Sequence, residues 1–308
     1  MRTPPPQTTF PRMALSRREL LVSGAGALLL AACGGAEGGD QQGTTDTTAS
    51  VQGSDGTLPA GFQLVQRFPS SPLFTPGQVR LPISLGDGQN LLTGGPRLID
   101  GWIETSNGDR IAELVAERRS DGIVVPYWEV RAELPEPAIY TLRLLGDDGY
   151  GATFELFEPG QIASPLTGSP LPPFSTPTID DHRGVEPYCT LTPDPCPFHA
   201  LTLTEALAAG TPLAYIVGTP AHCQTGTCAP GLELLVEASA RFGEGLTVVH
   251  ADVYADDAAT TVAPAVEALG IAYEPVIYLC DAKGVIVDRL DAIWDRGELN
   301  SRLDVLMA

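Results

Sequence analysis

The sequence predicts a multidomain protein in which an all-β domain is followed by an α/β domain. Apolar and polar residues alternate in five short runs between residues 78 and 159, a pattern that is typical of strands with one buried face. Helical and strand patterns alternate from Thr202 onward, as they do in α/β folds. Between these regions, residues 160–200 contain nine prolines, a composition that resists regular structure and indicates a semi-rigid connector.

The N-terminus has the pattern of an export signal. Arg17 and Arg18 precede a run of apolar or small residues that ends in the sequence LAAC at Cys33. This run is too short to span a membrane, and its flanks are those of a cleaved leader. The paired arginines resemble a twin-arginine signal and LAAC resembles a bacterial lipobox. The resemblance implies removal of residues 1–32 and attachment of lipid to the Cys33 thiol.

We therefore expect a lipid-anchored protein on the extracytoplasmic face of the cell membrane. Residues 33–60 contain almost no large apolar side chain, so they are expected to form a flexible tether. Without the leader the chain has 14 basic and 37 acidic residues, a net charge of −23. This charge excludes nucleic acid as a partner, because its phosphates would be repelled.

The all-β domain is predicted to span residues 61–159. In its first run, Val79, Leu81, Ile83 and Leu85 point to one side and the residues between them to the other, as in a half-buried strand. The other predicted strands are 98–105, 125–134, 139–146 and 152–159. Several short strands over about a hundred residues predict an immunoglobulin-like sandwich. Its sequence has no cluster of His, Cys or carboxylate residues, so binding a partner and spacing the next domain from the membrane are both open roles.

The connector carries two cysteines, Cys189 and Cys196, in the sequence CTLTPDPC. In an exported protein such a pair can close a small loop, and we expect a structural Cys189–Cys196 disulfide. A metal site would recruit His199 and His182 as further ligands, but the spacing fits no closed zinc pattern. The sequence therefore predicts no metal and no other cofactor.

The α/β domain is predicted to span residues 201–308. A capping-box sequence, TLTE, opens a helix that ends at Gly210. A nearly continuous apolar run then predicts a buried strand. The later elements follow in the order helix, strand, helix, two strands joined by the turn DAKG, and a last helix; their expected ranges are 231–243, 246–254, 262–269, 276–280, 285–290 and 295–307.

The chemistry of this domain is expected in the segment TPAHCQTGTCAP, residues 219–230, which places Cys223 and Cys228 between a strand and a helix. Together with the order of elements and the later segment YEPVIYLCDAKG, this corner resembles the thioredoxin family. The resemblance implies a thioredoxin-like fold over residues 201–308 and a cis proline, Pro275, beside a redox-active Cys223–Cys228 disulfide. It also implies thiol-disulfide oxidoreductase activity toward exported protein thiols or disulfides, or toward a membrane electron donor.

The sequence departs from the family in the spacing of its cysteines, which is four residues here and two in the family. Counting from the strand makes Cys223 the nucleophile. Counting from the helix makes Cys228 the nucleophile, with Gly231 at the position of the family's second cysteine. Amides at the helix N-terminus would favour a Cys228 thiolate, so this alignment is slightly preferred, although a nearby Glu274 would oppose the thiolate.

Other functions remain as alternatives. A binding or structural lipoprotein would keep the Cys223–Cys228 pair only as a stable disulfide. Peroxidase activity is disfavoured, because Pro220 stands where a peroxiredoxin has threonine. A copper site of the pair with His250 is also disfavoured, because the apolar neighbours of His250 indicate a core residue.

Two further side chains near this domain's motifs have open or minor roles. His222, next to the first cysteine, can tune the pair or can simply be a solvated surface residue. Cys280 ends an apolar run, so a buried, inert thiol is expected there.

Overall fold

The computed structural model describes residues 58, 60–70, 72–147 and 149–308. All of them belong to one compact unit, residues 51–308. The predicted leader, the lipidation site Cys33 and most of the predicted tether lie outside the described residues. Within this described part, none of the helices combines the length and the apolar character that crossing a membrane requires.

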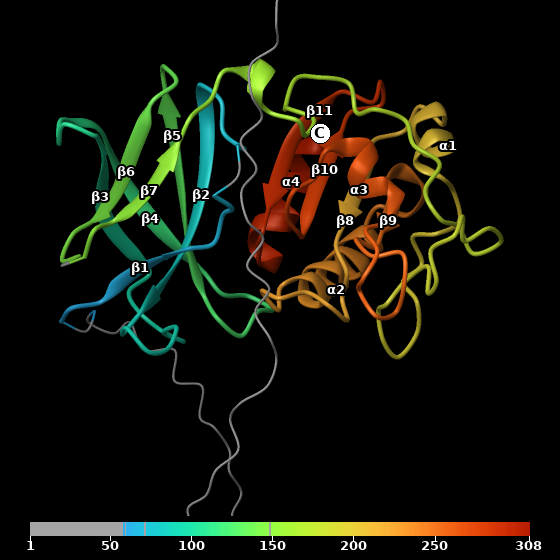
Figure 1. Ribbon diagram of the computed structural model, residues 1–308, viewed down its shortest axis with the longest axis horizontal. Coiled ribbons are helices and arrows are strands. Elements are labelled where there is room, and N and C mark those ends of the chain that lie inside the picture. The colour runs from blue at the N-terminus through green and yellow to red at the C-terminus, as the bar shows by residue number, and fades with distance from the viewer. Residues whose placement is uncertain (1–57, 59, 71, 148) are drawn as a thin grey trace, which may run out of the picture. The chain divides into compact units, whose positions relative to one another are not determined.

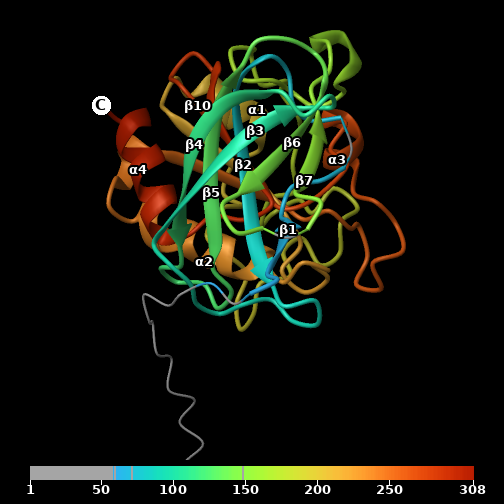
Figure 2. The ribbon, with the colours of Figure 1, turned by 90° about the vertical axis from the view of Figure 1, so that its left-hand side faces the viewer.

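The β half of the described chain is a seven-stranded antiparallel sheet (Figure 2). Its order is β1-β2-β5-β4-β3-β6-β7. The strands are β1 (Gln63–Gln66), β2 (Gly77–Gly86), β3 (Leu98–Thr105), β4 (Arg110–Arg119), β5 (Tyr127–Leu134), β6 (Ile139–Leu144) and β7 (Ala152–Glu155), followed by the short 3-10 helix η1 (Pro159–Gln161). All five predicted strands are present, and β1 and β4 were not predicted.

The immunoglobulin-like sandwich expected from the sequence is not confirmed, because all seven strands are hydrogen-bonded into one sheet. This sheet is curled, so that its two edge strands approach each other. The Gln66 side-chain amide donates to the Thr153 carbonyl at 2.5 Å, and Phe74 forms a bridge with Leu156. The curled sheet encloses one apolar core, in which Trp128 is fully buried.

Strand β2 is buried on both faces. Val79, Leu81, Ile83 and Leu85 lie in the core of the curled sheet, as the alternation predicts. The intervening Arg80 is buried as well, whereas the sequence pattern assigned it to a solvent-exposed face. The reason is that this second face packs against the C-terminal half of the chain.

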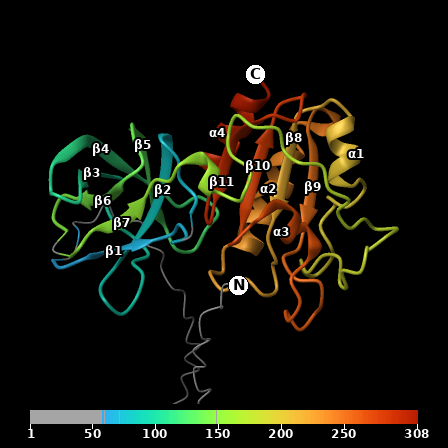
Figure 3. The ribbon, with the colours of Figure 1, turned by 45° about the horizontal axis from the view of Figure 1, so that its top comes forward.

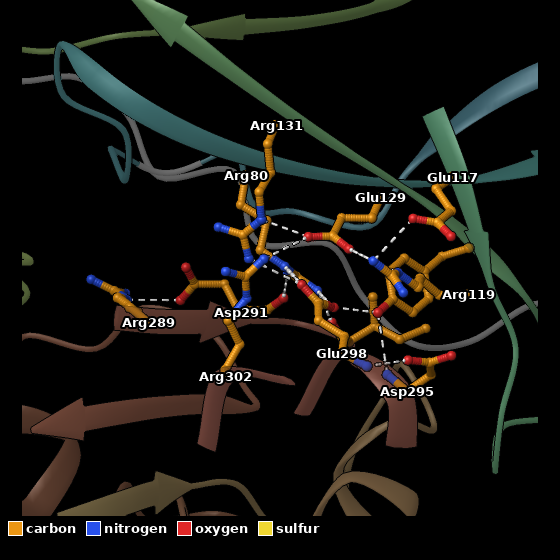
Figure 4. A network of polar contacts seen from close by, with 12 residues as sticks. Arg80, Glu117, Arg119, Glu129, Arg131, Arg289, Asp291, Asp295, Glu298 and Arg302 are labelled. Atoms are coloured by element: carbon orange, nitrogen blue, oxygen red, sulfur yellow. Dashed lines mark hydrogen bonds and ion pairs between the residues drawn. The ribbon is translucent and has the colours of Figure 1, made fainter. Parts of the chain in front are cut away.

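An ion pair between Arg80 and Glu298 lies at this contact (Figure 4). Arg80 Nε donates to Glu298 Oε1 at 2.7 Å and Nη2 donates to Oε2 at 2.6 Å, so the pairing is bidentate. Both side chains are almost fully buried, at 7% and 1% exposure. Burial alone would raise the pKa of Glu298, but the charge and hydrogen bonds of Arg80 outweigh it and lower this pKa to about 2.

Other polar contacts extend this junction on both sides. The carboxylate of Asp295 accepts the backbone amides of Ser120 and Asp121 at 2.9 and 3.0 Å. It also accepts the amide of Glu298 at 2.7 Å, as the N-cap of the last helix. The Tyr127 hydroxyl donates to Glu298. The charged groups described at the junction are therefore either paired with an opposite charge or hydrogen-bonded, which buried charges require.

The α/β half follows the order of elements predicted from the sequence (Figure 1). It contains α1 (Leu203–Ala208), β8 (Leu213–Val217), α2 (Cys228–Ser239), the 3-10 helix η2 (Gly243–Gly245), β9 (Thr247–Ala251), α3 (Pro264–Leu269), β10 (Val276–Cys280), β11 (Ile286–Asp291) and α4 (Arg296–Leu306). The sheet order is β11-β10-β8-β9, in which only β8 and β9 are parallel (Figure 3).

Helices cover both faces of this four-stranded sheet. Alternate residues of β8 and β10, including Tyr215 and Tyr278, pack with α1 and α3. The residues between them, including Ile216 and Ile277, pack with α2 and α4. Because both faces are covered, β8 and β10 read as continuous apolar runs.

The proline-rich connector lies along the edge of this sheet. The amide of Gly168 donates to the Ile286 carbonyl at 2.8 Å, and the amide of Leu171 donates to the Gly284 carbonyl at 2.9 Å. The Arg289 guanidinium on β11 donates to the Ser164 hydroxyl at 3.0 Å. The connector is therefore attached to the α/β half over much of its length.

Replacing Arg80 with alanine should leave Glu298 as a buried charge with weaker compensation. We expect the free energy of unfolding to fall by about 3 kcal/mol, the lower end of the usual cost of breaking a buried pair, because Arg131 still reaches Glu298 at 3.2 Å. Urea unfolding followed by tryptophan fluorescence measures this, since Trp128 and Trp294 are buried.

The matched control is Arg97→Ala, which removes an exposed ion pair with Glu117. Such pairs contribute less than about 1 kcal/mol. Equal effects of the two substitutions would show that the Arg80 pair does not hold the junction.

Candidate active site

Cys223 and Cys228 form a disulfide between the end of β8 and the start of α2. Their Cα atoms are 5.9 Å apart. Cys228 is the first residue of α2, and the Thr227 hydroxyl fixes the corner by donating to the Ala292 carbonyl at 2.7 Å. The two sulfurs therefore lie where the free amides of a helix N-terminus are available.

The two sulfurs differ in access. Cys228 is buried, at 1% exposure, whereas Cys223 is partly exposed. Cys223 Sγ accepts the amide N–H of Cys228 at 3.2 Å and lies 3.2 Å from the Thr225 hydroxyl. Cys228 was expected from the sequence to be the better activated sulfur, but the helix amide points to Cys223. Access and the amide hydrogen bond therefore both distinguish Cys223 from the buried Cys228.

Pro275 lies beside the disulfide, at the start of β10, and the Glu274–Pro275 peptide bond is cis. Gly218, at the end of β8, makes this packing possible. A Cβ atom at Gly218 would lie 3.1 Å from Pro275 Cβ and 3.6 Å from Cys228 Cβ. Only a residue without a side chain allows the proline and the cysteine to approach β8 this closely.

Gly231, the position of the family's second cysteine in one alignment, packs on the indole of Trp294. A Cβ atom there would lie 2.7 Å from the ring, and the indole N–H donates to the Gly231 carbonyl at 3.2 Å. This position serves helix packing, so the partner sulfur has to come from the preceding loop, as Cys223 does.

Glu274 places a carboxyl group next to the buried sulfur. Its Oε2 lies 3.5 Å from Cys228 Sγ and accepts the backbone amide of Thr219. Burial raises the pKa of Glu274, although the Thr219 hydrogen bond opposes this. The arrangement places beside Cys228 a carboxyl group that can accept or donate a proton and whose pKa is raised by burial.

His222, which the sequence analysis left open between tuning the pair and a solvated surface role, is partly buried. Its ring lies edge-on to Tyr254, with 6.1 Å between centroids.

A cleft of about 400 Å³ borders the disulfide loop. One wall comes from the α/β half and includes Gln224, Thr225 and Glu274, and the other comes from the β half and includes Arg67 and Phe68. Sequence reasoning missed the second wall, because β1 is short and carries no motif. The segment between Arg183 and Arg241, which contains the disulfide loop, has no Lys or Arg. Arg67 therefore supplies a positive charge at this cleft.

The predicted Cys189–Cys196 disulfide is not formed, and both residues are buried free thiols. His199 and His250 point at them, so that the four ligand atoms lie within 4.8 Å of one another. His182, considered as a ligand from the sequence, instead pairs with Glu186 at 2.7 Å. His250 is a buried residue, as expected, but it belongs to this second cysteine pair.

The remaining free thiol of the described residues, Cys280, is fully buried in β10. Burial raises its pKa to about 12, which keeps it protonated and unreactive at neutral pH.

Comparison with known proteins gives one structural neighbour to report. No family model and no curated protein matches the chain. A solved thiol:disulfide interchange protein of the thioredoxin family from Chlorobium tepidum TLS is similar to it, with a TM-score of 0.34 and 13% sequence identity. The match covers 47% of this chain and 100% of the neighbour.

In the reduced protein, Cys223 should react with iodoacetamide at least about tenfold faster than Cys228, because exposure and a stabilised thiolate both favour attack. Mass spectrometry of peptides from timed samples measures both rates. Cys280 is the internal control and should stay unmodified until urea unfolds the chain. Faster labelling of Cys228 would reverse the assignment of the two sulfurs.

Proposed function

We propose that this protein is a membrane-tethered, extracytoplasmic thiol-disulfide oxidoreductase that acts through Cys223 and Cys228. The observation that carries the proposal is the disulfide at the corner between β8 and α2, with one accessible sulfur and one buried sulfur, beside Pro275. A thioredoxin-like fold of residues 201–308 is part of the proposal, and the order of helices and strands supports it.

The exchange proceeds in two balanced steps. A substrate thiolate attacks Cys223 Sγ, the Cys223–Cys228 bond breaks, and Cys228 leaves as a thiolate that takes a proton from Glu274. The substrate's second thiolate then attacks the substrate sulfur of the mixed disulfide, and Cys223 leaves as the second thiolate. The substrate dithiol is oxidised by two electrons and the protein disulfide is reduced; the reverse sequence reduces a substrate disulfide.

The substrates we propose are exported proteins with thiols or disulfides, or a membrane electron donor that reduces the pair. The cleft beside the loop has room for a polypeptide segment that carries the reacting sulfur. Phe68 and Pro69 give it an apolar wall, and Arg67 gives it a positive charge. Location outside the cytoplasm is supported by the leader and the LAAC sequence at Cys33.

The reduction potential of the pair tests this function. The full chain is equilibrated against glutathione or dithiothreitol buffers, and Cys223 and Cys228 are read by mass-tagged alkylation. We expect a midpoint above about −300 mV, since catalytic pairs lie between about −270 and −120 mV. A midpoint below about −300 mV would make the pair a structural disulfide and favour a non-catalytic binding lipoprotein.

Single serine variants give a second measure of the same step. When the reduced Cys228→Ser variant is mixed with a peptide disulfide, Cys223 should attack it and the mixed disulfide should accumulate, because no Cys228 thiol remains to resolve it. Cys223→Ser should accumulate little, because Cys228 is buried. Equal trapping by the two variants would contradict the proposed order of attack.

In the direction that reduces a substrate disulfide, Cys228 attacks the mixed disulfide on Cys223 and Glu274 accepts the Cys228 proton. Glu274→Gln should slow this step by about tenfold or more, since a positioned acid or base typically contributes 10² to 10⁴-fold. With the native side chain, the rate should rise with pH as the carboxyl group, whose pKa is raised by burial, becomes able to accept the Cys228 proton. This rise should be absent in the variant. Stopped-flow measurement of single-turnover resolution against pH provides the comparison.

Glu267→Gln, on the exposed side of α3, is the matched charge control and should retain the native profile. A native profile in Glu274→Gln as well would remove Glu274 from the mechanism.

A further inference from the structure

Two cysteines and two histidines converge in a buried cluster that the exchange reaction does not use. Cys189, Cys196 and His199 come from the connector, and His250 comes from β9. Their exposures are 5%, 5%, 2% and 0%. The thiols are free although they are close together.

The four ligand atoms all lie within 4.8 Å of one another, and the three separations that involve His250 Nδ1 are close to the edges of a coordination tetrahedron. His199 Nε2 lies 3.2 Å from His250 Nδ1. His250 Nδ1 lies 3.7 Å from Cys189 Sγ and 3.3 Å from Cys196 Sγ. Tetrahedral zinc with ordinary bond lengths places two nitrogens roughly 3.3 Å apart and nitrogen–sulfur pairs roughly 3.6 Å apart.

The outer nitrogen of each ring already has an acceptor. His250 Nε2 lies 2.8 Å from the Gly218 carbonyl and 3.3 Å from Asp252 Oδ1. His199 Nδ1 lies 3.4 Å from the Pro177 carbonyl. With a proton on each outer nitrogen, the inner nitrogens, His199 Nε2 and His250 Nδ1, carry lone pairs that face each other. The hydrogen bonds of the outer nitrogens are of the kind that orients histidine ligands in metal sites.

We propose that Cys189, Cys196, His199 and His250 form a tetrahedral Cys2His2 site for zinc. Binding releases the two thiol protons, so that two thiolates neutralise the charge of Zn²⁺ within the buried cluster, and no oxidation state changes. Nitrogen and sulfur ligands in a closed tetrahedral set are those of structural zinc sites. The site therefore stabilises the fold, and it is independent of the proposed exchange reaction.

The cluster also joins the connector to the redox corner. His250 Nε2 is hydrogen-bonded to the carbonyl of Gly218. Gly218 in turn lies directly against Pro275 and Cys228. Asp252 accepts the amide of Thr190 at 3.0 Å, and the Thr190 hydroxyl accepts the amide of Ala221 at 3.3 Å. Zinc at this position fixes the backbone on both sides of the strand end that leads to Cys223.

Metal analysis of the purified full chain tests the proposal. Plasma mass spectrometry should find about one zinc per chain, because binding to such a structural site is tight. Cys189 and Cys196 should resist alkylation until a chelator is added. His250→Ala and Cys196→Ser should each lose the zinc, whereas His182→Ala and Cys280→Ser should retain it.

Two further measurements keep the test decisive. Zinc must remain in the Cys223→Ser/Cys228→Ser double variant, which excludes binding by the redox pair. Because ligand variants can unfold, the native chain is also stripped, reduced and titrated with Co²⁺, whose visible absorption should report tetrahedral thiolate ligation. The proposal would be overturned if Cys189 and Cys196 were found as a disulfide and the reduced chain then bound neither Zn²⁺ nor Co²⁺. Selective binding of copper at these residues would overturn it as well.

Discussion

The bidentate pair of Arg80 and Glu298 determines how the β half and the α/β half meet. Arg80 lies in the middle of β2 and Glu298 in the first turn of α4, and each is buried by the other's half. Their mutual pairing offsets the cost of removing both charges from water. The docked position brings Arg67 and Phe68 to the loop of Cys223 and Cys228, so the cleft of the proposed active site depends on a contact that does not include the sulfurs themselves.

Periodicity predicted the α/β half well because its elements carry strong local signals. The capping box of Thr202 and Glu205 is present as expected, and the buried strands are long apolar runs. The β half was harder. Strand β4, with the sequence RIAELVAERR, is composed largely of good helix formers, and its pairing with β3 overrides that propensity. Alternation predicted the inner face of β2 correctly but not the order in which the strands pair, so the single curled sheet was missed.

Local motifs located the Cys223–Cys228 pair, whereas the proposed metal cluster became visible only in the tertiary structure. Cys223 and Cys228 are close in sequence, and the strand and helix around them are readable. The cluster combines three connector residues with His250, which is 51 positions beyond His199. No spacing rule joins these segments, and the apolar neighbours of His250 pointed to a core residue. The sequence alone does not show that β8 pairs with β9, and this pairing places His250 opposite Ile216.

The two-sided burial of β2 has a consequence for how this chain can be divided. A fragment that ended in the connector would expose one whole face of β2, and Arg80 on that face would lose its carboxylate partner Glu298. A fragment that began in the connector would lack Arg80, and Glu298 would lose the arginine with which it is paired. The two halves therefore depend on each other for folding: recombination or gene fusion that transfers the corner of Cys223 and Cys228 must carry the curled sheet with it.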